Sequence, residues 1–178
     1  MYFTNRAASR SRMKEHNKLP TEIERKFLLS TLPHGIENLE SSYIEQGYLT
    51  AGDGDTEVRI RNRSGVFTLT YKKGFGLIRE EIEVSISQEA FYALWPATGS
   101  ARVVKTRYLM PWGDLFLEID AYAESLDSLV MCDIEFSSEK TARSVELPTW
   151  LGREITDDLH YANRNLAFYG IPKKTGGR

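Results

Sequence analysis

The chain has a single cysteine, Cys132, which excludes an intrachain disulfide framework and a cysteine-based metal cluster. No apolar run approaches the length needed to cross a bilayer. The sequence contains no phosphate-binding glycine loop, no dinucleotide fingerprint and no Ser/His/Asp nucleophile pattern. Its histidines, His16, His34 and His160, are scattered. We therefore expect a cytoplasmic protein without a membrane partner.

The composition is that of an ordinary globular chain of 178 residues, long enough for one domain with a substantial core. Hydrophobic residues make up 41% of the chain, charged residues make up 27%, and the formal net charge is −2. This balance gives no reason to expect a nucleic-acid partner.

Residues 1–19 differ from the rest of the chain because they are rich in bases and contain only one acid. They lack the apolar core of a signal peptide. We expect a flexible basic N-terminal tail over 1–19, in which Met13 is an alternative start to Met1. A single domain over 20–172 and a flexible tail over 173–178 follow. Without the basic tail the domain is moderately acidic, so anion binding would require its bases to be concentrated. The bases of the tail are Arg6, Arg10, Arg12, Lys14 and Lys18.

Polar and apolar residues alternate at period 2 along the chain, which predicts strands with two different faces. The stretch PTEIERKFLL at 20–29 is ambiguous. As a helix it would start with a capping box of Thr21 and Glu24, whereas a strand places Glu22, Glu24 and Lys26 on one face. Seven other segments alternate in the same way, so we interpret 21–28 as an eighth strand. The others are 43–49, 57–63, 66–73, 77–86, 102–110, 115–122 and 130–136.

Helices are predicted where a serine or threonine can cap a suitable run. They cover 88–95 after Ser87, a short stretch from Ser137 or Ser138 to about Ala142, and 157–169 after Thr156 with Gly170 beyond. Short turns between the strands indicate an antiparallel meander, and a sheet of this many twisted strands tends to close. The sequence therefore predicts an α+β fold, an eight-stranded antiparallel closed β-barrel with a charged lumen, flanked by helices.

The polar faces of these strands carry mainly full charges. Exposure to water is the ordinary interpretation of such a face, but solvated faces usually also contain Thr, Ser, Gln and Asn. Here the charges are sorted by strand. Bases predominate on the segments 57–63, 66–73 and 102–110, and only acids occur on the segments 115–122 and 130–136. The bases are Lys26, Arg59, Arg61, Lys72, Arg79, Lys105 and Arg107. The acids are Glu22, Glu24, Glu57, Glu81, Glu83, Glu118, Asp120, Asp133 and Glu135.

Inside a closed barrel these two sets of charges would suit a phosphate polyanion bridged by a metal ion. Guanidinium and ammonium groups donate to phosphate oxygens. Carboxylates bind hard divalent cations such as Mg²⁺ or Mn²⁺. Together they indicate phosphoryl transfer.

The order of these motifs resembles that of the CYTH superfamily, the triphosphate tunnel metalloenzymes. The resemblance covers about residues 20–170 and starts with Glu22-x-Glu24-x-Lys26, which is similar to the ExExK signature. That signature alone is weak, but the ordered set is strong. The further matches are Gln46-Gly47-Tyr48-Leu49, Arg59-x-Arg61, Lys72, Arg79-x-Glu81-x-Glu83, Lys105-x-Arg107, Glu118-x-Asp120, Asp133-x-Glu135 and the segment 149–167.

The resemblance implies a metal-dependent enzyme with Mg²⁺ or Mn²⁺ as cofactor. The chain is most similar to the bacterial inorganic triphosphatases, with QGYL and KTRY as local cues, and this implies hydrolysis of inorganic triphosphate to pyrophosphate and phosphate. The resemblance implies three sets of site residues. Catalytic residues are Lys26 and Tyr48. Triphosphate ligands are Lys26, Arg59, Arg61, Lys72, Arg79, Lys105 and Arg107. Metal ligands are Glu22, Glu24, Glu118, Asp120, Asp133 and Glu135.

In this interpretation neighbouring cations depress the pKa of Lys26, so that it assists proton transfer with Tyr48. Three alternatives remain open from the sequence: a class IV-type adenylate cyclase, a thiamine or nucleoside triphosphatase, and a non-catalytic polyphosphate-binding module. The sequence also leaves open whether the protein is a monomer or a homodimer.

Overall fold

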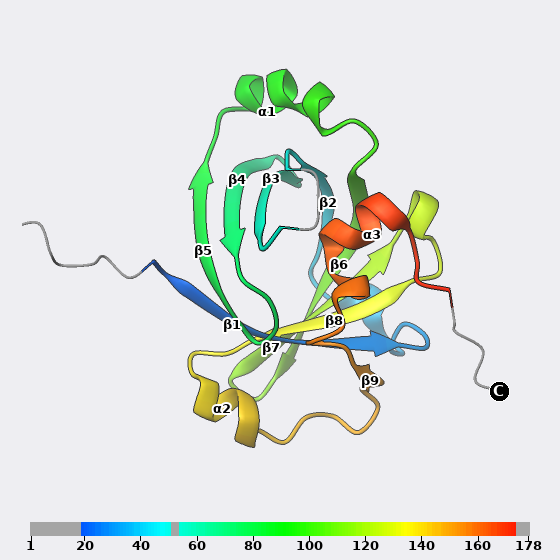
Figure 1. Cartoon of the computed structure of the whole chain (residues 1–178). Coiled ribbons are helices and arrows are strands. Elements are labelled where there is room, and N and C mark those ends of the chain that lie inside the picture. The colour runs from blue at the N-terminus through cyan, green and yellow to red at the C-terminus, as the bar shows by residue number, and fades with distance from the viewer. Residues whose placement is uncertain (1–18, 51–53, 174–178) are drawn as a thin grey trace, which may run out of the picture.

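Antiparallel pairing joins eight strands into a closed barrel (Figure 1). We analysed a computed structural model, which describes residues 19–50 and 54–173. The strands follow the order β5-β4-β3-β2-β6-β7-β8-β1, and β5 pairs with β1 to close the barrel. The predicted fold is therefore confirmed, and Thr21–Leu29 forms a strand. The bounds are β1 Thr21–Leu29, β2 Ser41–Tyr48, β3 Thr56–Arg63, β4 Val66–Lys73, β5 Ile78–Ser85, β6 Arg102–Trp112, β7 Leu115–Tyr122 and β8 Val130–Glu135.

One edge of β1 is shared between two partners. Its first residues, Thr21 to Ile23, pair with β5, and farther along the same edge Phe27 and Leu28 pair with the two-residue strand β9 (Arg153–Glu154). Next to β9, the Lys26 amide donates to the Thr156 hydroxyl (3.1 Å) and the Ile155 amide donates to the Lys26 carbonyl (2.8 Å). The C-terminal segment thus completes the barrel wall where β5 has diverged.

Two of the three predicted helices form as expected. Helix α1 (Gln88–Leu94) is capped by Ser87, and α2 (Glu139–Ser144) is capped by Ser138. Single 3-10 turns complete the connections: η1 Ile36–Asn38, η2 Trp95–Thr98 and η3 Glu124–Leu126. In the part of the chain that is described, no helix is long and apolar enough to cross a membrane. The predicted tails, 1–19 and 173–178, fall almost wholly outside the described residues.

The predicted continuous helix over 157–169 is wrong. Thr156 does not cap it because its hydroxyl is bound at the edge of β1. Instead Asp158 caps a 3-10 turn, η4 (Leu159–Tyr161), and the extended backbone of Ala162 interrupts the helical path. Helix α3 (Asn163–Tyr169) begins only after this break and lies beside β6 and β2 (Figure 1).

Two apolar cores lie on opposite sides of the barrel wall. The outer core contains Leu117, Ile119 and Ile134 and packs against Ala142 of α2. The inner core fills one end of the lumen, because its members lie on the same strand faces as the charged residues. It contains Tyr48, Val103, Tyr122 and Met131 from the strands and Ile155 and Leu166 from the C-terminal segment. The lumen is therefore charged over part of its length and apolar at one end.

Gly152 allows the C-terminal segment to approach β1. A Cβ atom at Gly152 would lie 2.0 Å from the Leu28 carbonyl oxygen, so a side chain would force the two backbones apart. We expect Gly152→Ala to lower the free energy of unfolding by about 1–3 kcal/mol, the usual cost of overpacking. Denaturant unfolding would measure this change. Gly54→Ala is the matched control, since the nearest atom to its Cβ would be 3.9 Å away. Equal midpoints for the two variants would contradict the prediction.

Candidate active site

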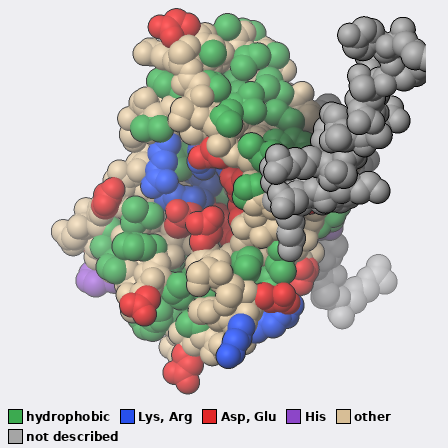
Figure 2. Space-filling view, turned by 90° about the vertical axis from the view of Figure 1, so that its left-hand side faces the viewer, with side chains coloured by type: hydrophobic (Ala, Val, Ile, Leu, Met, Phe, Trp, Pro, Cys, Tyr) green, Lys and Arg blue, Asp and Glu red, His purple; other side chains and the backbone are tan. Residues whose placement is uncertain are grey.

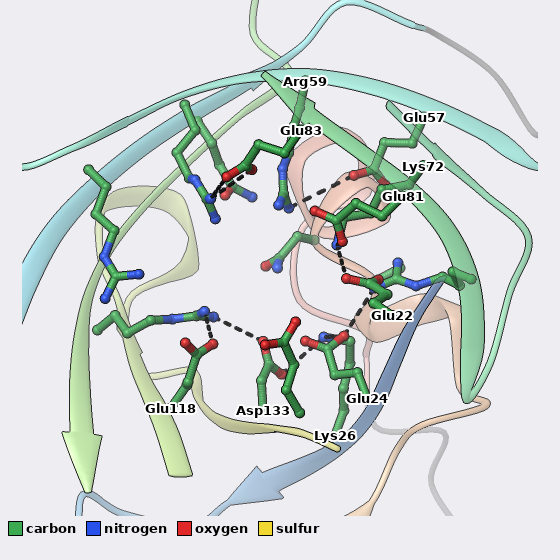
Figure 3. A pocket seen from close by; sticks show the side chains of 18 of the residues that line it. Glu22, Glu24, Lys26, Glu57, Arg59, Lys72, Glu81, Glu83, Glu118 and Asp133 are labelled. Atoms are coloured by element: carbon green, nitrogen blue, oxygen red, sulfur yellow. Dashed lines mark hydrogen bonds and ion pairs between the residues drawn. The ribbon is translucent and has the colours of Figure 1, made fainter. Parts of the chain in front are cut away.

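The charged part of the lumen is a polar cavity that opens to solvent (Figures 2 and 3). In Figure 2 basic and acidic side chains gather in a hollow on this face of the molecule. The cavity has a volume of about 230 Å³. Its walls include every base predicted to bind triphosphate and every predicted metal ligand except Asp120. Tyr48 does not line this cavity either.

Asp120 is buried and binds two bases of the lumen. The basic wall of the cavity consists of Arg59, Arg61, Lys72, Arg79, Lys105 and Arg107. The Asp120 carboxylate accepts from Arg107 Nε (2.7 Å) and Nη2 (2.6 Å) and from Lys105 Nζ. Burial alone would raise the pKa of Asp120, but Arg107 and Lys105 lower it to about 2. The guanidinium of Arg107 also donates to Asp133 (3.0 Å) and to Glu118. Asp120 is therefore an ionised counter-ion that fixes two lumen cations.

A second group of charges joins β1, β4 and β5. Lys72 Nζ lies 2.7 Å from Glu22 Oε2 and 3.0 Å from Glu81 Oε2, and Arg79 contacts both Glu22 and Glu24. Burial and a hydrogen bond with Glu22 raise the pKa of Glu81 to about 7. Burial opposes ionisation of Glu22, but this hydrogen bond and the bases Lys72 and Arg79 lower its pKa to about 2. Glu81 therefore holds the proton that the two acids share, and Glu22 is ionised.

Lys26 lies between two carboxylates at the acidic side of the lumen (Figure 3). Its Nζ is 2.6 Å from Glu24 Oε2 and 3.0 Å from Asp133 Oδ1. Burial alone would lower the pKa of Lys26, but Asp133 and Glu24 outweigh it and raise the pKa above its ordinary value. The expectation of a depressed pKa is therefore wrong for this arrangement.

Tyr48 lies deeper than Lys26, in the inner apolar core with Tyr122. Its hydroxyl accepts from Gln46 Nε2 at 2.7 Å. Burial and the nearby Glu57 raise the pKa of Tyr48, so the hydroxyl stays protonated at neutral pH. Within the described residues no hydrogen bond joins Tyr48 to Lys26, and the catalytic pair stays a prediction.

The acids of β1, β7 and β8 form two like-charged cross-strand pairs, which is a destabilising arrangement. Glu24 lies directly opposite Glu135, and Glu118 lies directly opposite Asp133. Burial and the neighbouring Glu118, Glu24 and Glu22 raise the pKa of Glu135. In the described part of the chain Glu135 has no cationic partner. A hard divalent cation would offset this repulsion, so the donor set fits Mg²⁺ or Mn²⁺.

The carboxylates of the described residues are not arranged to coordinate a metal ion directly. Among residues 19–50 and 54–173, no three His, Cys, Asp or Glu side chains are positioned as a ready-made metal site. Glu24 is bound to Lys26 and Arg79, while Asp133 is bound to Lys26 and Arg107. Metal binding would therefore require an exchange of these partners.

The lumen also contains residues that the sequence did not mark as candidates: Gln46, Arg63, Ala162 and Asn163. Alternation places Gln46 and Arg63 on the correct faces, so their positions could have been inferred. Asn163 lies within the segment 157–169, for which a continuous helix was predicted. The break at Ala162 brings Asn163 to the lumen, and no clear pattern in the sequence predicts this break.

A closed antiparallel barrel with a basic wall and a carboxylate wall around one cavity defines a class of polyanion-binding tunnel domains. The chain belongs to the CYTH family, since the CYTH domain matches residues 20–167.

Two curated relatives are similar to most of this chain. An inorganic triphosphatase of Nitrosomonas europaea is 43% identical over 149 residues, which span 83% of this chain and 97% of the relative. An inorganic triphosphatase of Acetivibrio thermocellus is 30% identical over 149 residues, which span 82% of this chain and 92% of the relative. A crystal structure of an inorganic triphosphatase superimposes with a TM-score of 0.62 at 38% identity, covering 84% and 96% of the two chains.

The raised pKa of Glu81 has a measurable effect on stability. Between its ordinary value of 4.5 and about 7, the folded protein keeps a proton that the unfolded chain releases. The contribution of Glu81 to stability therefore falls as the pH rises through this window. We subtract the unfolding free energy of Glu81→Gln from that of wild type. We expect this difference to decrease as the pH rises from 4.5 to 7. Denaturant unfolding at several pH values would measure it.

The control for this experiment is Glu80→Gln, a substitution on the outer face of the same strand. It should follow the wild-type pH dependence. If both variants show the same pH dependence, the assignment of the shared proton to Glu81 is wrong.

Proposed function

We propose that this protein is a metal-dependent inorganic triphosphatase that hydrolyses inorganic triphosphate to pyrophosphate and phosphate. The observation that carries the proposal is the meeting of a basic wall and a carboxylate wall around one cavity. The similarity to two curated inorganic triphosphatases supports it. The choice between Mg²⁺ and Mn²⁺ and a cytoplasmic location are further parts of the proposal.

The basic wall has donors available for phosphate. Arg59 Nε and Arg61 Nε are buried and have no hydrogen-bond partner among the described residues. An unsatisfied buried donor is costly, and a phosphate oxygen would satisfy it. The ion pair of Arg59 with Glu57 is long, with Nη1 4.0 Å from Glu57 Oε1. We therefore assign Arg59 and Arg61 as central phosphate ligands. Lys72, Arg79, Lys105 and Arg107 surround them.

The carboxylate wall would hold the cation through Glu22, Glu24, Glu118, Asp133 and Glu135. A bound Mg²⁺ or Mn²⁺ supplies charge neutralisation and a more acidic water molecule. If Glu24 and Asp133 held the cation, Lys26 would lose both of its carboxylate partners. Its ammonium group would then be free to bind a phosphate oxygen. The role of Tyr48 in proton transfer remains part of this proposal.

The lining of the cavity favours an inorganic substrate over an organic one. Within the described residues, the only uncharged side chains that line it are Gln46, Ala162 and Asn163. Recognition of a nucleobase or a thiamine ring usually needs an aromatic or apolar wall. The adenylate cyclase and the thiamine or nucleoside triphosphatase are therefore weaker alternatives.

Glu24→Gln tests the metal assignment. The change removes one negative charge from the carboxylate wall, and we expect phosphate release from inorganic triphosphate to fall by about 100-fold or more. The assay uses wild type and variant with Mg²⁺ and with Mn²⁺. Glu80→Gln, on the outer face of the barrel, is the matched control and should retain activity.

Full activity of Glu24→Gln would show that the metal assignment is wrong. For wild type, the assay should also include ATP, thiamine triphosphate and long-chain polyphosphate. Formation of cyclic AMP would indicate a cyclase. Binding without turnover of any substrate would indicate a binding module.

Asp120 was predicted as a metal ligand but does not line the cavity, and we assign it a positioning role. Asp120→Asn should raise the KM for triphosphate by about 10-fold, because Arg107 and Lys105 lose their shared anion. The affinity of Asp120→Asn for Mn²⁺, measured by electron paramagnetic resonance, should be close to that of wild type. Glu135→Gln should lower this affinity. If Asp120→Asn weakens Mn²⁺ binding as strongly as Glu135→Gln does, Asp120 is a metal ligand.

A further inference from the structure

The side chain of Asn163 is a neutral group in a cavity that is otherwise lined almost entirely by charges. It comes from the first residue of α3, whereas the charged side chains come from the strands. In Figure 3 the C-terminal helical segment, in faint red, lies behind the ring of charged side chains. Asn163 contacts Tyr122 of the inner apolar core, so it reaches the cavity at its inner end.

A single hydrogen bond fixes the orientation of the Asn163 amide. The Tyr122 hydroxyl donates to Asn163 Oδ1 at 2.5 Å. Because an amide oxygen can only accept a hydrogen bond, the Tyr122 hydroxyl is the donor. Because Oδ1 is used in this way, Nδ2 is the free end of the amide. No residue in the described ranges accepts a hydrogen bond from Nδ2.

Two residues that follow Asn163 hold the first turn of α3 in place. The next residue, Arg164, is buried and donates through Nη1 to the carbonyls of Gly54 (2.9 Å) and Thr56 (3.0 Å). Leu166 is buried in the inner apolar core. The amide of Asn163 is thus positioned before any ligand binds, which reduces the entropic cost of using it.

We propose that Asn163 is a substrate-binding residue whose Nδ2 donates to the phosphoryl group that lies deepest in the lumen. This inference rests on the proposed triphosphatase function. Most of the cavity bases are bound to carboxylates and must exchange partners to bind phosphate, whereas Asn163 Nδ2 is free. A neutral donor adds a hydrogen bond to the substrate without adding a charge that needs a counter-ion.

Two substitutions at Asn163 separate substrate binding from a structural role. Asn163→Ala removes the donor, and we expect the KM for inorganic triphosphate to rise by roughly 10-fold, the effect of losing one hydrogen bond to a charged group. Asn163→Asp keeps an oxygen that accepts from Tyr122 but replaces the donor with an anion. It should raise KM more than Asn163→Ala does.

If Asn163→Ala leaves the KM for inorganic triphosphate at the wild-type value, Asn163 only anchors Tyr122 and the inference is wrong. Asn165→Ala is the matched control on the same helix. The Asn165 amide donates to the Leu159 carbonyl and does not line the charged cavity. Its KM should stay within about twofold of wild type, because no contact with substrate is removed.

A double-mutant cycle with Tyr122→Phe tests how the amide is oriented. The variant keeps the ring in the inner core but removes the hydroxyl that binds Asn163. We expect it to raise KM in the wild-type background and to have little further effect in the Asn163→Ala background. Fully additive effects would show that Tyr122 does not act through Asn163.

A binding measurement distinguishes failure of this inference from failure of the proposed function. Calorimetric titration with inorganic triphosphate in the presence of EDTA reports binding without turnover. Weaker binding by Asn163→Ala than by wild type would support the inference even if no substrate were hydrolysed. Equal affinities and equal KM values would overturn it while leaving the triphosphatase proposal intact.

Discussion

Burial of many charged side chains inside a closed barrel is the constraint on which the rest of this structure depends. An unpaired charge in such a place costs several kcal/mol, so buried charges need partners. Neighbouring strands supply them. Lys26 of β1 meets Asp133 of β8, and Arg107 of β6 meets Asp120 of β7. A one-residue slip of any strand would turn its charges toward the outer core, so the same pairs also fix the register.

Closure of the barrel is a second consequence of this constraint. Glu22 and Arg79 bring β1 and β5 together inside the lumen, but the two strands pair over only a short stretch. The C-terminal segment completes the remaining edge through β9 and Thr156. It also adds Leu166 to the inner core and Asn163 to the cavity. One segment therefore contributes to the wall, the core and the site.

The sequence was sufficient to predict which face of each strand is charged but not how deep each residue lies. Period-2 alternation places Glu24, Lys26 and Asp120 on one face, and this part of the prediction is confirmed. It carries no information on position along the barrel axis. Tyr48 and Asp120 therefore could not be distinguished from residues that reach the cavity. The break in the helix before Asn163 was not predicted. The Thr156 hydroxyl accepts a hydrogen bond from the Lys26 amide of β1, and local capping patterns do not reveal such a tertiary contact.

The ion pairs of the lumen also constrain how a ligand can bind. Most of its cations are already neutralised by carboxylates, so a triphosphate that bound alone would have to compete with Glu22, Asp120 and Asp133 for the same bases. A divalent cation that bound alone would compete with Lys26 and Arg79 for Glu24. If both bound together, the carboxylates could contact the cation and the bases could contact the phosphates. In the proposed reaction, metal and substrate therefore each strengthen the binding of the other, because each removes the other's competitor.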